Sequence, residues 1–356
     1  MKTALTDRLG LDLPIIQAPM AGTSTPELAA TVSNAGALGS ISIASVDAVE
    51  GRRQIQALKA LTTGPFNVNL FCHAPTPPDP ACDRVWIDSL RPIFAAFDAA
   101  PPETLTEIYQ SFLTDDAKLA VLLDDKPAVV SFHFGLPQAE KIAALKSAGC
   151  LLIASATTPQ EGRLAQAAGI DMVVAQGFEA GGHRGVFDPA DDPRFATLPL
   201  TRLLARELDI PVIAAGGVMD GAGIAAALAL GAAGAQLGTA FVSCPESAAN
   251  AAYRAALAGP RAERTRVSAA ISGRPARGVE NAFMQRADEA LAAGYPYAYD
   301  LGKALNAAAS AQGDDGYAPQ WAGQAAPLGR ALPAAELVEA LAREIRAAIA
   351  DLQQLL

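Results

Sequence analysis

The stretch AVVSFHFGLPQAEKIAALKSAGCLLIASA (residues 128–156) contains one complete unit of strand, helix and strand. Its two ends, 128–134 and 150–156, are short and apolar throughout, which is typical of parallel strands buried on both faces. The segment between them, 137–149, opens with proline and closes with glycine, the usual boundaries of a helix. This unit therefore predicts a parallel sheet whose neighbouring strands are joined by helices.

The same unit recurs along the chain. The candidate strands are LPIIQAP (13–19), ALGSISI (37–43), FNVNLF (66–71), AVVSFHF (128–134), CLLIASA (150–156), DMVVAQG (171–177), PVIAAGG (211–217) and AQLGTAF (235–241). Eight such strands favour an α/β fold of the (β/α)8 TIM-barrel type, and a doubly wound sheet is the structural alternative. The 356 residues suffice for one large core, or for one core and a smaller second domain.

Two regions interrupt the repeat. Residues 73–126 follow the third strand and are first rich in proline and then helical, whereas residues 262–332 follow the last unit and are irregular. We predict that they form a small, mainly helical cap and substrate region over a barrel made of residues 1–72 and 127–261. The amphipathic segment 333–356 predicts a final helix that packs on the barrel or serves a homodimer contact.

Composition excludes several classes of function. The chain is 51% hydrophobic but has no unbroken apolar stretch of about 18 residues, so we expect no membrane partner. Its net charge of −10, without a long Lys/Arg run, argues against nucleic acid. The four cysteines lack CxxC spacing, so we expect neither disulfides nor a metal site. The first residues, MKTALTDRLG, lack the apolar core of a signal peptide, and we expect a cytoplasmic protein.

Glycines follow the last two candidate strands at the barrel mouth, where TIM-barrel enzymes bind their ligands. Gly216 and Gly217 end the seventh strand, and QLGT (236–239) ends the eighth. This arrangement predicts a phosphate-bearing ligand, although a tight turn alone also explains the glycines. The missing G-x-G-x-x-G argues against a Rossmann dinucleotide site. QAPMAG (17–22), after the first strand, offers an apolar lip suited to a flat ring, or is simply a core strand that leaves the barrel.

Two of the three histidines lie at or just beyond strand ends. His183 is flanked by glycines and has no local core, so we expect it to act as a base, a hydrogen-bond donor or an anion partner. His133 stands between Phe132 and Phe134, so for this residue a core position is an equal alternative.

The remaining polar candidates each have a structural reading as well as a functional one. Glu179 can be a general base or can cap loop backbone. Arg184 can hold an anionic substrate or pair with an acid. Tyr109, Tyr299 and Lys303 can line the roof of the pocket from the cap, or can be ordinary packing or exposed side chains.

Four stretches together resemble the class I nitronate monooxygenases, FMN enzymes formerly called 2-nitropropane dioxygenases. They are PIIQAPMAG (14–22), SFHFG (131–135), QGFEAGGHRG (176–185) and AAGGVMDG (214–221), and the similarity continues to QWAGQAAPLGR (320–330). The glycine–histidine loop alone is shared with FMN-dependent enoyl reductases and NADH:quinone reductases on the same barrel. SFHFG and the flanking Gln176 and Arg184 favour the monooxygenase.

The resemblance implies FMN as the cofactor, with its phosphate near Gly217 and the QLGT strand end. It also implies that His183 is the catalytic residue and faces the reacting edge of the flavin. The residues expected at the cofactor are Ala18, Pro19, Met20, Asn69, Gln176, Gly181, Gly182, Gly216, Gly217, Gln236, Leu237, Gly238 and Thr239.

The reaction that the resemblance implies is the oxidative denitrification of alkyl nitronates, such as propionate 3-nitronate, a detoxification. The nitronate passes one electron to FMN, giving a flavin semiquinone, and O2 then leads to a carbonyl product and nitrite. His183 would hold the nitronate as an imidazolium or as a hydrogen-bond donor. We expect the substrate to meet His133, Tyr109, Arg184, Tyr299 and Lys303.

Two other functions stay open at this point. One is an FMN-dependent NAD(P)H reductase of enoyl thioesters or quinones, and the other is a barrel that binds a phosphorylated metabolite without redox chemistry.

Overall fold

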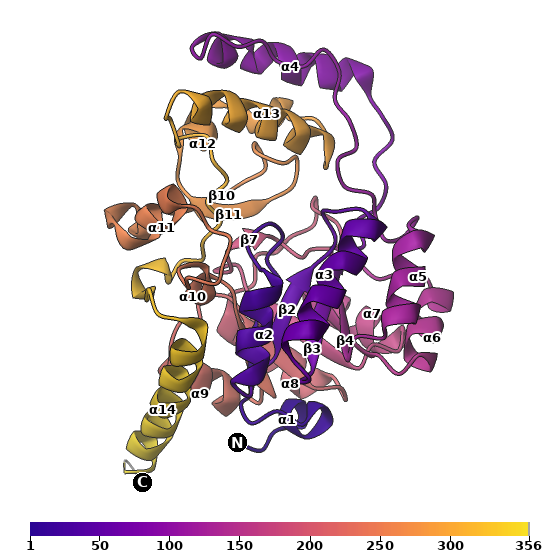
Figure 1. The fold of residues 1–356 in the computed structure, drawn as a ribbon, viewed down its shortest axis with the longest axis vertical. Coiled ribbons are helices and arrows are strands. Elements are labelled where there is room, and N and C mark those ends of the chain that lie inside the picture. Colours follow the sequence, from indigo (N-terminus) through magenta and orange to yellow (C-terminus); the bar gives the residue numbers. More distant parts are fainter. Residues whose placement is uncertain (355–356) are drawn as a thin grey trace.

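The computed structural model describes residues 1–354 and contains an eight-stranded parallel sheet with the strand order β1-β9-β8-β6-β5-β4-β3-β2. A bridge between Ile16 and Leu38 brings the two outermost strands, β1 and β2, together, so the sheet closes into a barrel (Figure 1). The strands are β1 (Ile15–Gln17), β2 (Gly39–Ser42), β3 (Phe66–Phe71), β4 (Val129–His133), β5 (Leu151–Ala156), β6 (Met172–Gln176), β8 (Val212–Ala215) and β9 (Gly234–Leu237). The predicted TIM barrel is therefore confirmed, and the doubly wound alternative is wrong.

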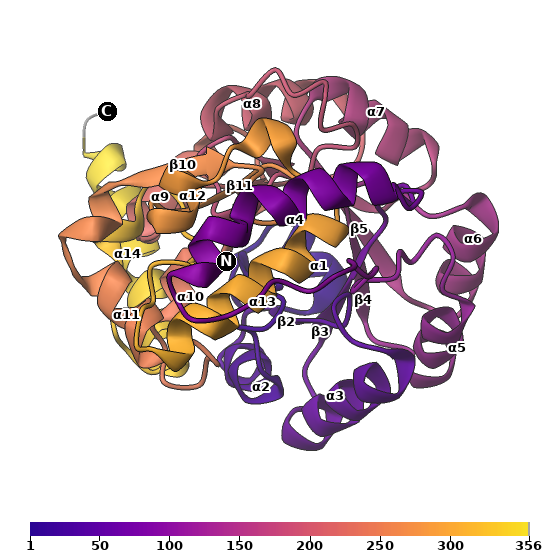
Figure 2. The same ribbon diagram turned by 90° about the horizontal axis from the view of Figure 1, so that it is seen from above.

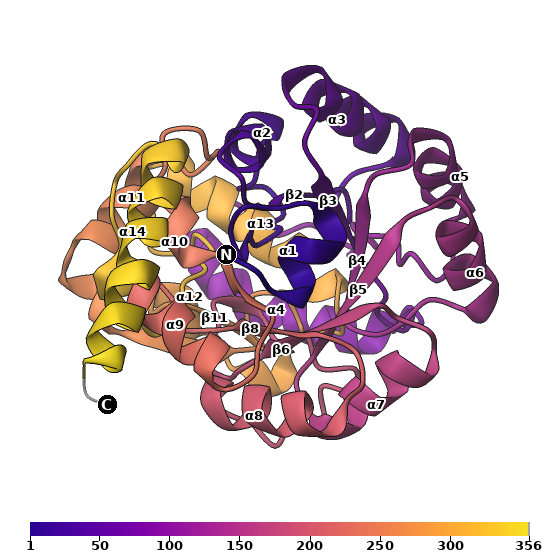
Figure 3. The same ribbon diagram turned by 90° about the horizontal axis from the view of Figure 1, so that it is seen from below.

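Helices surround the barrel. They are α2 (Pro26–Asn34), α3 (Ala48–Leu61), α5 (Asp116–Asp125), α6 (Ala139–Ser147), α7 (Pro159–Ala167), α8 (Thr197–Glu207), α9 (Gly221–Ala229) and α14 (Ala334–Gln353). The last of these packs against α9 and α2, and it takes the place beside β9 that the four-residue helix α10 (Thr239–Val242) is too short to fill. The short helix α1 (Ala4–Leu9) crosses the bottom of the barrel (Figure 3). No helix within residues 1–354 combines the length and apolarity needed to cross a bilayer.

Helix starts follow the chemistry visible in the sequence. Thr25 caps α2 by accepting a hydrogen bond from the Leu28 amide, and Pro26 occupies the first turn. Thr158 and Glu161 form a reciprocal capping box at the start of α7. Such caps fix where each helix begins, and hence how far each preceding loop extends at the barrel mouth.

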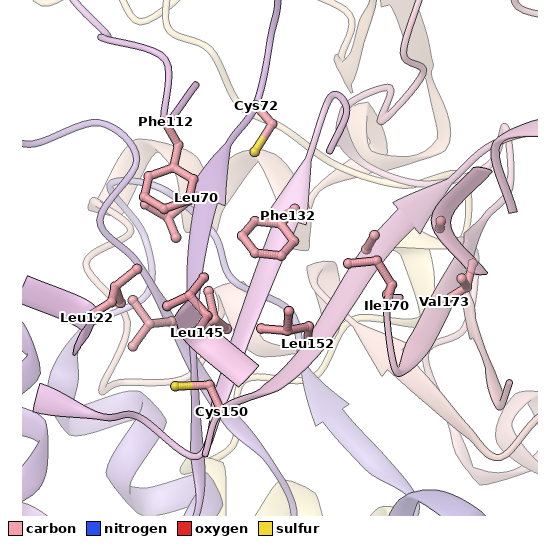
Figure 4. Packing of buried hydrophobic residues seen from close by; sticks show 14 of the residues in the cluster. Leu70, Cys72, Phe112, Leu122, Phe132, Leu145, Cys150, Leu152, Ile170 and Val173 are labelled. Atoms are coloured by element: carbon pink, nitrogen blue, oxygen red, sulfur yellow. The ribbon is translucent and has the colours of Figure 1, made fainter. Parts of the chain in front are cut away.

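Both faces of the strands are buried, which explains their continuous apolar pattern. Leu70, Phe132 and Leu152 point out of the barrel toward the helices, where they meet side chains such as Leu145 (Figure 4). A second cluster fills the barrel, and Leu5 of α1 seals it from below. The strand members of that inner cluster include Ile16, Val129, Ile153, Met172, Val174, Ile213 and Ala215.

A cap covers the barrel mouth. Two of its helices, α4 (Pro80–Ala95) and α13 (Tyr297–Ala311), pack together and cross over the mouth (Figure 2). The other segments on this side are α11 (Ala251–Ala258), α12 (Ala282–Arg286), η1 (Pro260–Glu263), η2 (Glu289–Leu291) and η3 (Ala326–Leu328). Of the inserted residues 73–126, α4 and the segment after it, which contains Leu105 and Tyr109, join this cap. In contrast, α5 packs with α3 and α6 in the ring of helices.

The cap also contains a small antiparallel sheet that the sequence pattern does not reveal. It consists of β10 (Thr265–Ser268), β11 (Ala276–Val279) and β7 (Gly182–His183), in that order. These strands have only four, four and two residues and include arginine and glycine, so no alternating apolar pattern can be seen in them.

We predict that Gly221→Ala lowers stability by forcing α14 away from α9. A Cβ at Gly221 would lie 2.3 Å from the Cβ of Glu344 and 2.3 Å from the amide nitrogen of Ile345. We expect the free energy of unfolding to fall by about 1–3 kcal/mol, measured by denaturant unfolding. Gly223→Ala, in the same helix, is the matched control because its nearest neighbour would lie 3.3 Å away. Equal stability of the two variants would contradict the close packing.

Candidate functional site

A single pocket at the carboxyl ends of the barrel strands collects most of the predicted site residues. Those that line it are Ala18, Pro19, Met20, Asn69, Tyr109, His133, Gln176, Gly181, Gly182, His183, Gly216, Gly217, Gln236, Gly238, Thr239 and Tyr299. Ile153, Val174 and Ala215 of the inner barrel cluster form its floor. The pocket therefore lies between the barrel and the cap, where a TIM barrel places its active site.

His183 reaches the pocket because the loop after β6 becomes a strand of the cap sheet. Gly182 and His183 pair antiparallel with Arg277 and Ala276 of β11. Gly182 has φ +76°, a conformation that favours glycine. Figure 1 shows β7 between the barrel and the cap. This pairing turns a glycine-rich loop into a fixed support for the histidine.

The ring of His183 lies among aromatic side chains and is partly buried. Its centroid is 5.3 Å from that of Trp321 and 5.8 Å from that of Tyr295. Burial, together with the proximity of His133 and Arg274, lowers the pKa of His183 to about 3. The ring is therefore neutral near pH 7, which favours the predicted hydrogen-bonding role over the predicted imidazolium.

His133 supports His183 from below and also lines the pocket. Its Nε2 lies 3.2 Å from the carbonyl oxygen of His183, and its Nδ1 lies 2.9 Å from Oγ of Ser155. Because a carbonyl only accepts, Nε2 carries the proton and Nδ1 accepts from the serine hydroxyl. Burial lowers the pKa of His133 to about 4, so this ring is also neutral.

The side-chain amides of Gln176 and Asn69 line the pocket while bracing its walls. Gln176 donates to the carbonyl oxygen of His183 at 3.0 Å and accepts from the amide of Gly185 at 2.7 Å. Asn69 donates to Oγ of Ser131 at 2.9 Å. Both amides are thus oriented by the protein itself before any ligand arrives.

Arg184 does not reach the pocket. Its guanidinium forms a two-pronged ion pair with Asp192, at 2.8 and 3.0 Å, and donates to the carbonyl oxygens of Gln176 and Gly177. The side chain is 1% exposed and, because neighbours in an extended strand point to opposite sides, it faces away from the space that His183 faces. Arg184 fastens the loop to the barrel and is not available to an anionic substrate.

Glu179 has a structural role in this geometry. Its carboxylate accepts hydrogen bonds from the backbone amide of Thr197 at 2.9 Å and from the hydroxyl of the same residue at 2.9 Å. Thr197 is the first residue of α8, so Glu179 satisfies an amide at the start of that helix. No catalytic role is needed to explain this residue.

Two further predicted residues lie outside the pocket. The side chain of Leu237 is buried in the core beneath α14, together with Ile15, because it points out of the barrel. Nζ of Lys303 lies 4.7 Å from the ring centroid of Tyr109 and 5.5 Å from that of Tyr299. The lysine therefore stacks on two tyrosines that line the pocket and does not line it itself.

The pocket also contains residues that the sequence did not single out as site residues. They include Ser131, Ser155, Tyr253, Tyr295 and Trp321. Tyr295 and Trp321 belong to segment 262–332, whose many aromatic residues could have indicated that it lines the pocket. Tyr253 lies in the alanine-rich helix α11. It reaches the pocket only because this helix packs beside the barrel mouth, so its sequence neighbours give no indication of the contact.

The pocket walls fit a phosphate attached to a flat ring. Gly217, Val218, Gly238 and Thr239 line the pocket, and no hydrogen-bond acceptor is found for their backbone amides within residues 1–354. Unpaired amides converging after two neighbouring strands suit a phosphate. The apolar lip at Ala18–Met20 provides a surface for a ring. No group of three or more potential metal ligands is found in the described part of the chain.

We predict that the neutral, partly buried histidines of the pocket make the fold sensitive to acid. Unfolded histidine has a pKa of about 6.5, so between pH 7 and pH 5 the unfolded chain takes up protons that folded His133, with its pKa lowered to about 4, does not. Stability is then present above the unfolded pKa and is lost as the pH falls toward the folded pKa. We expect His133 to account for about 2 kcal/mol of this loss.

Denaturant unfolding of the wild type and of His133→Asn at pH 7 and pH 5 measures this contribution. The variant should lose less stability between the two pH values than the wild type does. The same loss in both proteins would show that His133 is protonated in the fold.

The chain matches a protein family and several known proteins along nearly its whole length. The chain matches the family model described as "Nitronate monooxygenase" over residues 2–344. It is 58% identical to a nitronate monooxygenase of Paraburkholderia phytofirmans, over 99% of this chain and 98% of that protein. It is 55% identical to a nitronate monooxygenase of Pseudomonas aeruginosa, over 96% of this chain and the whole of that protein.

Solved structures show the same fold. A nitroalkane oxidase from Streptomyces ansochromogenes superposes with a TM-score of 0.90 at 42% identity, over 98% of this chain and 100% of that one. FabK from Thermotoga maritima superposes with a TM-score of 0.78 at 28% identity, over 100% of both chains. The resemblance inferred from the four sequence stretches is thus confirmed, and the chain belongs to the nitronate monooxygenase family.

Proposed function

We propose that this protein is an FMN-dependent nitronate monooxygenase that converts alkyl nitronates and O2 into a carbonyl product and nitrite. The observation that carries the proposal is the position of His183. Strand β7 holds this neutral histidine inside the one pocket that also contains the unpaired amides after β8 and β9. Membership of the family supports the reaction, and the chemistry of the pocket supports the cofactor.

FMN would place its phosphate at the amides of Gly217, Val218, Gly238 and Thr239, which lack other acceptors in the described chain. Its ring would lie against Ala18–Met20 and the backbone of Gly181, at the depth of Asn69 and Gln176. The bound flavin supplies one-electron oxidation of the nitronate, which no side chain of the protein can carry out. The protein supplies position, hydrogen bonds and exclusion of water.

His183 is suited to orienting an anion that is already formed. A nitronate carries its negative charge on the nitro oxygens, so the protein need not remove a proton from carbon. A neutral imidazole can donate one hydrogen bond to such an oxygen in a water-poor pocket, where an interaction of this kind is stronger than in water. Tyr295, Tyr299 and Trp321 line the pocket from the cap and add apolar surface beside this ring.

We propose propionate 3-nitronate as a substrate, with its carboxylate toward Tyr109 and Tyr299. Burial raises the pKa of Tyr109 to about 12, so its hydroxyl remains a donor at physiological pH. Burial also raises the pKa of Tyr299. Lys303, stacked on both rings, places a positive charge behind these donors. Arg184, bound to Asp192, has no part in this recognition.

We predict that His183→Asn abolishes most nitronate turnover while keeping FMN. The ring contributes an oriented donor at the substrate and no contact to the phosphate amides, so we expect kcat/KM for nitrite release to fall by a factor of about 100 or more. Nitrite formation in air with an alkyl nitronate measures this, and the flavin absorbance of the purified variant measures cofactor content.

His73→Asn is the matched control, because His73 is buried but does not line the pocket. It should retain turnover in protein that binds FMN. Normal turnover by His183→Asn would mean that this histidine only shapes the pocket.

A further inference from the structure

We propose that the hydroxyl of Ser272 determines which ring nitrogen of His183 carries the proton, and thereby switches His183 between an acceptor in the free pocket and a donor toward a bound anion. Ser272 is a positioning residue, since it acts through His183 and does not line the pocket. The assignment of the anion as a nitronate rests on the proposed function, whereas the hydrogen-bond geometry at Ser272 is independent of that function.

Ser272 lies in the turn between β10 and β11 and is fully buried. Its Oγ is 2.9 Å from Nε2 of His183 and 3.0 Å from the carbonyl oxygen of Arg274. The backbone amide of Arg274 also points at this oxygen, from 3.4 Å. One hydroxyl therefore faces two groups that can each accept its single hydrogen.

Counting protons leaves two arrangements for a neutral His183 ring. In the first, the hydroxyl donates to the Arg274 carbonyl, Nε2 carries the ring proton and donates to Oγ, and Nδ1 is left with a lone pair. In the second, the hydroxyl donates to Nε2, so the ring proton is on Nδ1. The Arg274 carbonyl then has no donor within residues 1–354.

The first arrangement is the resting one, because a buried carbonyl without a donor is costly. In that state Nδ1 of His183 carries a lone pair and acts as a hydrogen-bond acceptor toward the pocket. The ring lines the pocket, and Nδ1 has no hydrogen-bond partner within residues 1–354. An anion beside Nδ1 favours the second arrangement, because a hydrogen bond to a charged acceptor is roughly twice as strong as one between neutral groups.

A doubly protonated ring is not an easy alternative. The guanidinium of Arg274 stacks on the ring of Phe134, 4.4 Å from its centroid, and the centroid of that ring lies 5.7 Å from that of His183. Arg274 has no carboxylate partner in the ion pairs of the described chain. The buried positive charge of Arg274 opposes a second proton on His183. When the Ser272 hydroxyl hydrogen moves from the Arg274 carbonyl to Nε2, the ring stays neutral and can donate from Nδ1 to an anion.

Nuclear magnetic resonance of ¹⁵N-histidine-labelled, FMN-loaded protein tests the proposal directly. The chain has only three histidines, and the His183→Asn spectrum assigns the ring of interest. In the free protein we expect Nε2 of His183 to be protonated and Nδ1 to be unprotonated. With nitrate as a planar anionic probe, we expect the proton to appear on Nδ1 instead.

Ser272→Ala should lose the single resting tautomer and show a mixture, and its kcat/KM for nitrite release should fall about tenfold at unchanged FMN content. Ser268→Ala is the matched control, because Ser268 is a buried serine of the same sheet that contacts Glu289 and not His183. It should leave both the tautomer and the turnover unchanged.

Four results would overturn the proposal: Nδ1 protonated in the free protein, a doubly protonated ring, the same tautomer in the wild type and Ser272→Ala, or a ring that stays protonated at Nε2 with nitrate bound. If nitrate fails to bind, nitrite serves as the second planar anionic probe, and the free-state comparison still tests whether Ser272 sets the resting tautomer. A proton shift without nitrite release from nitronates would retain the role of Ser272 and reject the nitronate as substrate.

Discussion

The pairing of two short strands, β7 with β11, is the interaction on which the site depends. It joins the loop after the sixth barrel strand to the cap, and it places His183 under a roof of aromatic side chains. Two side chains then fasten this loop to the end of β6. Gln176 donates to the backbone carbonyl of His183, and Arg184 donates to the backbone carbonyls of Gln176 and Gly177. The histidine is thus held by the barrel and the cap together, which makes the pocket a property of the whole chain.

The second constraint is electrostatic. The pocket keeps its histidines neutral through burial, and the nearby guanidinium of Arg274 reinforces this state. A neutral ring can bind an anion only by donating a hydrogen bond from its single N–H group. Binding of the anion therefore depends on which ring nitrogen carries the proton rather than on the charge of the ring. This explains why a buried hydroxyl, that of Ser272, stands directly behind the ring.

The barrel was predictable from the sequence because each strand is buried on both faces, as Val129 (inside the barrel) and Val130 (under the helices) of β4 illustrate. The site was only partly predictable. Strand ends such as Gln176 and His183 follow from the barrel, but β7 forms only when β11 arrives from about a hundred residues later, so local pattern cannot reveal it. Arg184 was misplaced as a substrate contact because an arginine in a polar loop looks available until its partner, Asp192, is seen. Leu237 was misplaced because one residue of register separates the pocket side of a strand from its core side.

The central claim is that the pocket brings a nitronate, rather than a nicotinamide, to a bound flavin. The alternative that the sequence left open is an FMN-dependent NAD(P)H reductase on the same kind of barrel. The direct measurement is the absorbance of the FMN-loaded protein without oxygen, after adding either an alkyl nitronate or NADH. We expect the nitronate to bleach the oxidised flavin and NADH to leave it unchanged. Bleaching by NADH with no response to the nitronate would contradict the account.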